Sequence, residues 1–122
     1  MGCDIHALIE RKVGDKWVMV NRLDGAATRR NYMRFSALAG VRGDGPAAKG
    51  LPDDLSESGR LYADDWEGDA HSHSFLGAKE AAGIFLETEH EPDNYAKSYP
   101  CSHFFDIERD EDSHRLVFWF DN

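Results

Sequence analysis

The sequence predicts a small α+β domain, in which a mostly antiparallel sheet of about four strands is covered by two or three helices. Three observations support this fold class: an N-terminal segment alternating between apolar and polar residues, a C-terminal run of apolar residues, and stretches of helical spacing between them. The chain has 122 residues, a length typical of one domain, so we expect residues 1–122 to fold as a single domain.

The first predicted element is a strand over residues 3–11, because its side chains alternate with a period of two. One face would carry Cys3, Ile5, Ala7 and Ile9, and the other Asp4, His6, Leu8 and Glu10. Residues 13–16 have the composition of a turn, and residues 17–20 return as a second strand. The chain is therefore expected to begin with a β-hairpin.

A first helix is expected after Asn31, which is placed to cap it. Its apolar positions are Tyr32, Phe35, Leu38 and Ala39. Gly40 is placed to end the helix. The following residues 41–52 are rich in glycine and proline but match no phosphate-binding spacing, which favours a plain surface loop.

Two more helical segments are expected further along the chain. Residues 53–66 are predicted to form a short helix or helical turns, and the inward side chains would be Leu55, Leu61, Tyr62 and Trp66. Residues 68–74 are expected to be extended or looping. Helix is expected again over residues 78–87, where Glu80 follows a cap position at Gly77.

The C-terminal part is predicted to supply two more strands, over residues 104–109 and 114–121, after a polar loop at 88–100. Residues 116–120 are apolar at every position. A strand of this kind is covered on both faces, so we expect it in the centre of the sheet with helices packed against it.

Acidic residues outnumber Lys and Arg by 23 to 14, which gives a formal net charge of −9. This charge argues against direct nucleic-acid or anionic-membrane binding, since phosphates would be repelled. It is compatible with cation binding, with docking onto a partner protein that has a basic surface, or simply with solubility. The N-terminus has no signal segment and no apolar run approaches the length of a membrane span, so we expect a cytoplasmic protein.

In the cytoplasm the two cysteines, Cys3 and Cys101, are expected to be buried, reduced thiols rather than a disulfide. Cys3 could also act as a metal thiolate or a nucleophile. No helix N-terminus or adjacent cation marks it as activated, which favours the structural interpretation.

The most unusual stretch is Asp69-Ala70-His71-Ser72-His73. In an extended backbone its alternate side chains share one face, so one carboxylate and two imidazoles would converge. These groups suit zinc, manganese or iron. Asp4 and His6 repeat the Asp-x-His pattern on the first strand. If the two segments face each other, the five side chains would surround one point and could hold a divalent metal (zinc or manganese) or supply a base.

The same residues are also compatible with a polar network that has only a structural role. Known His-x-His enzyme folds fit poorly, because amidohydrolase barrels need about twice this length. The Asp-His pair expected of metallo-β-lactamase proteins is absent, and the glutamate expected of cupins is replaced by Gly77-Ala78. A Ser-His-Asp triad using Ser72 or Ser74 would lack a nucleophile elbow. Catalytic residues therefore stay unassigned.

Five segments occur in a characteristic order along the chain. They are Met1-Gly2-Cys3-Asp4-Ile5-His6, residues 30–42 from Arg30-Asn31-Tyr32 to Gly40-Val41-Arg42, Gly50-Leu51-Pro52-Asp53-Asp54, residues 69–76 from Asp69 to Leu76, and Phe118-Trp119-Phe120-Asp121-Asn122. Together they resemble a family of short, mostly uncharacterised proteins encoded by bacteriophages and prophages. The resemblance spans nearly the whole chain and implies a phage setting rather than a particular reaction.

The resemblance also bears on individual residues. Relatives tend to place a threonine where this chain has Gly77, which weakens the cap of the helix at 78–87. The resemblance implies that Asp121 and Asn122 belong with the polar residues of the site, and the terminal strand would then deliver Asp121 beside Asp4 and His6.

Three functions are left open. The first is a small phage accessory protein that acts by binding, for example as an inhibitor of a host defence or nucleic-acid-handling component. The second is a metal-dependent hydrolase, such as a phosphoesterase acting on a nucleotide, with the Asp and His residues as ligands or base. In the third, the His/Asp cluster only stabilises the fold.

Overall fold

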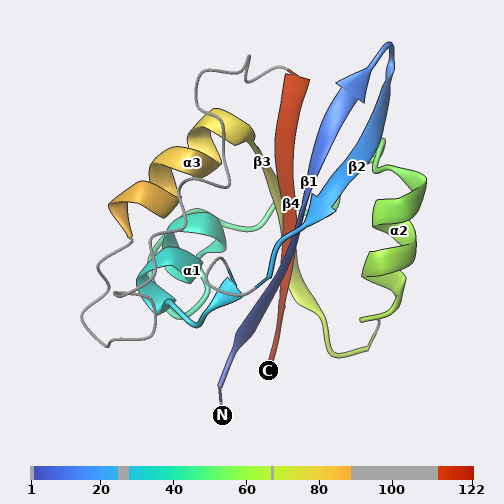
Figure 1. Ribbon diagram of the computed structural model, residues 1–122. Coiled ribbons are helices and arrows are strands. Elements are labelled where there is room, and N and C mark those ends of the chain that lie inside the picture. Colours follow the sequence, from blue (N-terminus) through green and yellow to red (C-terminus); the bar gives the residue numbers. More distant parts are fainter. Residues whose placement is uncertain (1, 25–27, 67, 89–112) are drawn as a thin grey trace.

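In the computed structural model, residues 2–24, 28–66, 68–88 and 113–122 are described, and they form a four-stranded antiparallel sheet with three helices (Figure 1). Along the chain the elements are β1 (Asp4–Val13), β2 (Lys16–Arg22), α1 (Tyr32–Ala39), α2 (Glu57–Asp64), β3 (His71–Gly77), α3 (Ala78–Glu87) and β4 (His114–Asp121). The predicted α+β class is confirmed. None of these three helices has the length and apolar character needed to span a bilayer.

The strand order is β2-β1-β4-β3, and every neighbouring pair is antiparallel. The C-terminal strand β4 therefore lies in the interior of the sheet, as its uninterrupted apolar run predicts. All of its residues from His114 to Phe120 are buried. Strand β1 is the other interior strand, and the hairpin predicted at the start of the chain places β2 at one edge.

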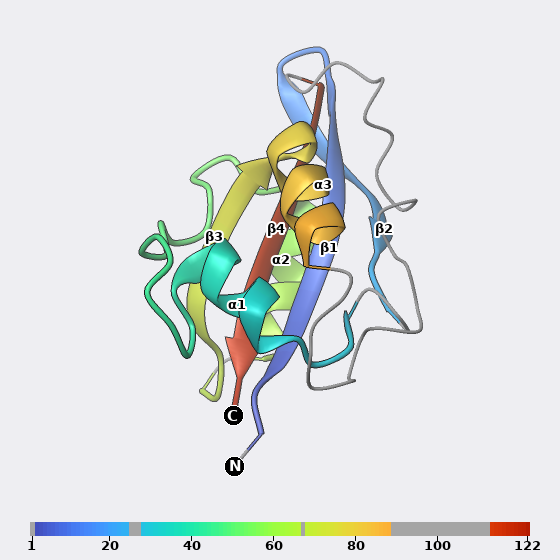
Figure 2. The same cartoon turned by 90° about the vertical axis from the view of Figure 1, so that its left-hand side faces the viewer.

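Helices cover the two faces of the sheet unequally (Figures 1 and 2). Helices α1 and α3 lie on one side, which we call the apolar face, and α2 lies on the other, which we call the mixed face. Helix α1 has the predicted ends: the Asn31 side chain accepts from Arg34 N–H, and Gly40 closes the helix with a positive φ of 72°. Helix α3 begins at Gly77 without a side-chain cap.

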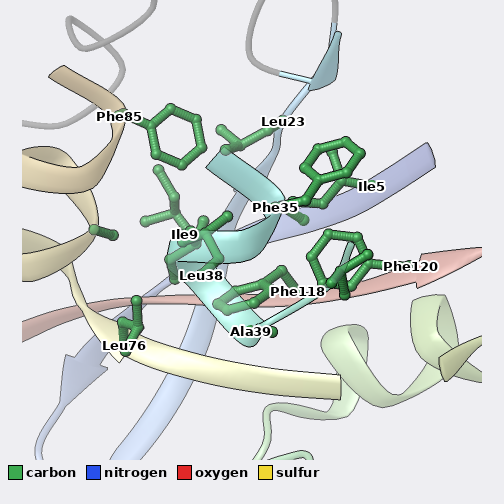
Figure 3. Close-up of a cluster of buried hydrophobic side chains, with 14 of the residues drawn as sticks. Ile5, Ile9, Leu23, Phe35, Leu38, Ala39, Leu76, Phe85, Phe118 and Phe120 are labelled. Carbon is green, nitrogen blue, oxygen red and sulfur yellow. The ribbon is translucent and has the colours of Figure 1, made fainter. Parts of the chain in front are cut away.

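The apolar face holds the larger hydrophobic core (Figure 3). Strand β1 contributes the alternating residues that its sequence predicts, and β4 contributes aromatic rings, of which Phe120 packs against Phe35 of α1. The fully or almost fully buried members include Cys3, Ile5, Ala7, Phe35, Leu38, Phe85, Leu116, Phe118 and Phe120. Burying these side chains supplies most of the hydrophobic stabilisation of the domain.

The mixed face is a ladder of cross-strand pairs between β1 and β4. From one end to the other the pairs are Asp4–Asp121, His6–Trp119, Leu8–Val117 and Glu10–Arg115. The middle of this ladder is apolar and packs under α2, whereas both ends are polar.

At one end of the ladder, a buried ion pair anchors the mixed face to α2. Arg115 donates to Glu10 at 2.6 Å and to the Asp54 carboxylate at 2.8 Å. The second Glu10 oxygen accepts from the backbone N–H of Ser56 at 2.8 Å, and Ser56 is the N-cap of α2. Because Glu10 is completely buried, its charge depends on these partners.

Some boundaries differ from the prediction. The helix expected over 53–66 is confined to α2, because Ser56 caps it, and Leu61, expected to face inward, is 64% exposed. The extended stretch expected at 68–74 forms an edge strand from His71 to Gly77. The predicted strand at 104–109 and Cys101 lie outside the described residues.

Candidate functional site

The polar end of the ladder near the chain ends brings Asp4, His6 and Asp121 onto the mixed face, where the start of β1 meets the end of β4 (Figure 1). Asp4 and Asp121 are direct partners in the antiparallel register, and His6 follows Asp4 on the same side of the strand. The predicted placement of Asp121 beside Asp4 and His6 is therefore confirmed by the strand pairing.

His6 and Asp121 form a hydrogen-bonded pair. The distance from His6 Nε2 to Asp121 Oδ2 is 3.1 Å, and the two side chains are only 15% and 16% exposed. The His6 ring also stacks on Trp66, with 3.8 Å between ring centroids and 25° between planes. Asp121 and Trp66 together fix the orientation of the His6 ring. A histidine that binds a metal or transfers a proton is oriented by neighbouring groups in the same way.

Asp4 is held by Arg30 from the segment that precedes α1. Arg30 Nε donates to one carboxylate oxygen at 2.8 Å, and its Nη2 donates to the other at 3.4 Å. This forked contact with the guanidinium holds the pKa of Asp4 below its ordinary value. Asp4 is therefore ionised at neutral pH.

These residues line a pocket of about 400 Å³, which we call the terminal pocket and define by Asp4, His6, Asp24, Tyr62, Trp66 and Asp121. No lysine or arginine is among the described residues that line it. Asp24 is exposed and makes no hydrogen bond or ion pair with the described residues. The pocket thus combines carboxylates with two aromatic walls.

Tyr62 forms the wall contributed by α2. The Arg22 guanidinium lies 3.9 Å from its ring centroid, and the edge of the ring contacts Trp119, 5.0 Å between centroids. Burial raises the pKa of Tyr62 above its ordinary value, and the nearby carboxylates of Asp24 and Asp65 add to this effect. The phenol is therefore protonated at neutral pH and can donate a hydrogen bond.

A second pocket of about 400 Å³ lies between β2 and the start of α2. Its carboxylate Asp54 already accepts from Arg115 and from the indole N–H of Trp17, at 2.8 and 3.1 Å. This carboxylate therefore takes part in the structural network that anchors α2. Lys16 also lines the second pocket, whereas no lysine or arginine is among the described residues that line the terminal pocket, so the terminal pocket is the better candidate for binding a cation.

The prediction that His71 and His73 share one face is wrong. His71 pairs with Phe120 and Ser74 pairs with Phe118, so β3 has one extra residue at this point. Ser72 takes up the bulge with a φ of 56°. As a result the His71 ring stacks over Phe120 on the apolar face, while His73 stacks over Trp119 on the mixed face.

His73 and His6 do share the mixed face. They lie on the two strands that flank β4, and their ring centroids are 5.9 and 6.3 Å from that of Trp119. Burial lowers the pKa of His73 below its ordinary value, and His71 lowers it further. This histidine is thus a neutral ring stacked on Trp119 and is not among the described residues that line the pocket.

The remaining predicted site residues lie apart from the pocket. Asp69 is exposed in the turn before β3. His71 bonds to Asn122 and Ser72, both at 3.0 Å. Cys3 is completely buried in the apolar core, and burial raises its thiol pKa, which opposes a role as a thiolate.

The five side chains proposed as metal ligands are therefore not gathered at one point. Across residues 2–24, 28–66, 68–88 and 113–122, no group of three His, Cys, Asp or Glu side chains is arranged to hold a metal ion. Zinc or manganese binding by Asp4 and His6 stays a prediction.

Sequence reasoning missed several residues of the terminal pocket. The sequence predicts that Tyr62 and Trp66 face inward, but it does not assign them to a pocket. Their spacing of four residues on a helical segment could have indicated that both rings line the same side of a site. Asp24 carries no local signal, since an aspartate after a strand is ordinary turn composition.

No protein-family model matches this chain, and neither curated proteins nor solved structures show a significant match to it. The function must therefore be argued from the terminal pocket and its surroundings.

Proposed function

We propose that this chain is a small phage-type accessory protein that acts by binding, inside the host cell, a partner protein with a basic surface. The observation that supports this most directly is the terminal pocket, where Asp4, Asp24 and Asp121 converge and no Lys or Arg lines the described walls. A host defence or nucleic-acid-handling component is the kind of partner proposed, because such proteins carry basic surfaces that normally hold phosphates.

The charge of the whole chain supports the same proposal. A net charge of −9 attracts a basic surface over a distance and accelerates encounter, while it repels nucleic acid. The pocket adds what a diffuse charge lacks, namely carboxylates held in fixed positions by β1 and β4. Aromatic side chains such as Tyr62 and Trp66 are enriched in specific interfaces, where a partner's arginine is also a common anchor.

The test is capture of a partner from host lysate with three forms of the protein. The Asp53→Asn variant is the control, because it removes an exposed carboxylate outside the pocket. Both the wild type and this variant should retain the same partner protein. The amount retained should fall as the salt concentration is raised. Asp24→Asn should lose it. Equal retention by Asp24→Asn and the wild type, or no specific protein with any form at micromolar bait, would contradict the proposal.

A second candidate is a metal-dependent hydrolase, such as a phosphoesterase acting on a nucleotide. The observation that favours it is the orientation of His6 by Asp121 at the pocket, since a carboxylate commonly orients a metal-binding or basic imidazole. His6 would be a ligand oriented by Asp121, and Asp4 would have to leave Arg30 to join it. Binding of zinc or manganese should raise the melting temperature of the wild type but not of His6→Gln; no shift with either ion would contradict this candidate.

A further inference from the structure

We propose that the terminal pocket binds a single guanidinium group, the side chain of an arginine on the partner surface. This inference rests on the proposed function, because it names the group that a basic partner would insert. A general attraction between charges would accept any cation. The proposed site requires a planar cation that carries several hydrogen-bond donors.

The open acceptors of the pocket fit such a group. Asp121 bonds to His6 through Oδ2 only, so its Oδ1 has no partner among the described residues. Asp24 makes no hydrogen bond or ion pair with them at all. A guanidinium carries five N–H donors in a fixed plane, and carboxylates are its preferred acceptors. A phosphate or carboxylate ligand would instead be repelled by both carboxylates.

The aromatic walls fit a planar cation as well. Tyr62 and Trp66 line the pocket, and aromatic rings attract cations; His6 covers one face of Trp66, and Arg22 already lies over the ring of Tyr62. The volume of about 400 Å³ accommodates an arginine side chain, whose weakly hydrated guanidinium loses less on leaving water than a lysine ammonium.

The chain's own arginines already make both of these contacts at the rim. Arg30 makes a forked contact with Asp4, and the guanidinium carbon of Arg22 lies 3.9 Å from the ring centroid of Tyr62. These contacts show that the groups around the pocket accept guanidinium in both geometries. Within the described part of the chain, they also leave Asp24 and Oδ1 of Asp121 as the acceptors for an arginine from outside.

The probe is Nα-acetyl-arginine-methylamide. Its binding to the intact protein is monitored by NMR, through the chemical shifts of the indole N–H signals. The Trp66 signal should shift saturably at millimolar probe, whereas the Trp17 signal should not, because that indole lies at the other pocket and donates to Asp54. The neutral citrulline analogue should bind at least about tenfold more weakly, since it keeps the shape and loses the charge. The lysine analogue should also bind more weakly.

Matched variants locate the site. Asp24→Asn should weaken arginine binding by about tenfold, and Asp53→Asn should leave it unchanged. Melting temperatures of both variants close to the wild-type value show that any loss comes from the pocket. No shift at Trp66, equal binding of citrulline, or equal effects of the two variants would each overturn the inference.

The outcomes also separate this inference from the proposed function. If the protein captures a basic partner but does not bind the arginine probe, the guanidinium site is wrong and the binding function stands. If it binds the probe but captures no partner, the pocket chemistry stands and the proposed function is wrong.

Discussion

The two faces of the sheet are built by the same two interior strands, yet they differ in almost every physical property. On the apolar face, β1 and β4 contribute Ile5, Ala7, Ile9, Leu116, Phe118 and Phe120, and two helices cover them (Figure 3). On the mixed face the alternate residues form a ladder that is apolar only in its middle, and a single helix, α2, lies over it (Figure 1).

This difference shows how one short chain separates stability from function. The core residues of the apolar face lie under two helices and contribute to packing. The mixed face exposes the ends of its ladder, so Asp4, His6 and Asp121 are held by rigid strands and still reach a pocket. Within the described residues, the buried side-chain nitrogen without a hydrogen-bond partner, Trp119 Nε1, also lies on this face. The mixed face is therefore less fully satisfied than the apolar one.

The largest effect is expected from the apolar face. Phe118→Ala should lower the free energy of unfolding by about 4 kcal/mol, because it removes a fully buried ring between the sheet and the helices. Leu61→Ala on α2, where the side chain is 64% exposed, should change it by less than about 0.5 kcal/mol. Urea unfolding measures both; similar losses would contradict the assignment of the core.

The next largest effect should come from the buried ion pair of the mixed face. Arg115→Met should destabilise the fold by about 3 kcal/mol, because Glu10 stays buried without its counter-charge. Adding Glu10→Leu should restore about half of that loss, since an apolar pair needs no counter-charge. Urea unfolding of the single and double variants checks this, and a double variant less stable than Arg115→Met would contradict the unpaired charge of Glu10 as the cause of the loss.

A smaller effect is expected where β4 ends. Asp121→Ala should lower stability by about 1 kcal/mol, because the Asp121 carboxylate pairs with His6 and both side chains are mostly buried. Asn122→Ala removes the exposed bond to His71 and should lower it by less than about 0.5 kcal/mol. Thermal unfolding measures the loss of stability in both variants. A greater loss for Asn122→Ala than for Asp121→Ala would contradict the prediction that the His6–Asp121 contact is the stronger one.

The smallest effect should be a pH dependence that arises at His73. Its pKa is lowered in the folded state from an ordinary value of 6.5, so protons bind the unfolded chain more tightly. Its contribution to stability should be complete above about pH 6.5 and should decline as the pH falls from there towards the lowered pKa. His73→Gln should flatten this part of the curve of stability against pH, whereas His71→Gln should retain most of it; no change in slope with His73→Gln would contradict the assignment.

Much of the fold follows from local signals in the sequence. The alternation of β1 predicts which residues enter the core, and the unbroken apolar run of β4 predicts a strand covered on both sides, because neither pattern depends on distant partners. The same holds for the ends of α1, where Asn31 and Gly40 act through contacts within one helical turn. Asp121 also reached its predicted place, although only the family resemblance suggested it.

The site depended on tertiary structure. A residue's face in a strand changes with every inserted residue, so the bulge at Ser72 sends His71 and His73 to opposite sides, and no spacing in the sequence shows it. In the same way, Trp66 meets His6 and Asp24 joins the pocket only because α2 and the end of β2 pack near the chain ends. The sequence by itself determined which side chains are apolar, alternating or capping; the pairing of strands decided which polar groups share one pocket, because those contacts join residues that are far apart in the chain.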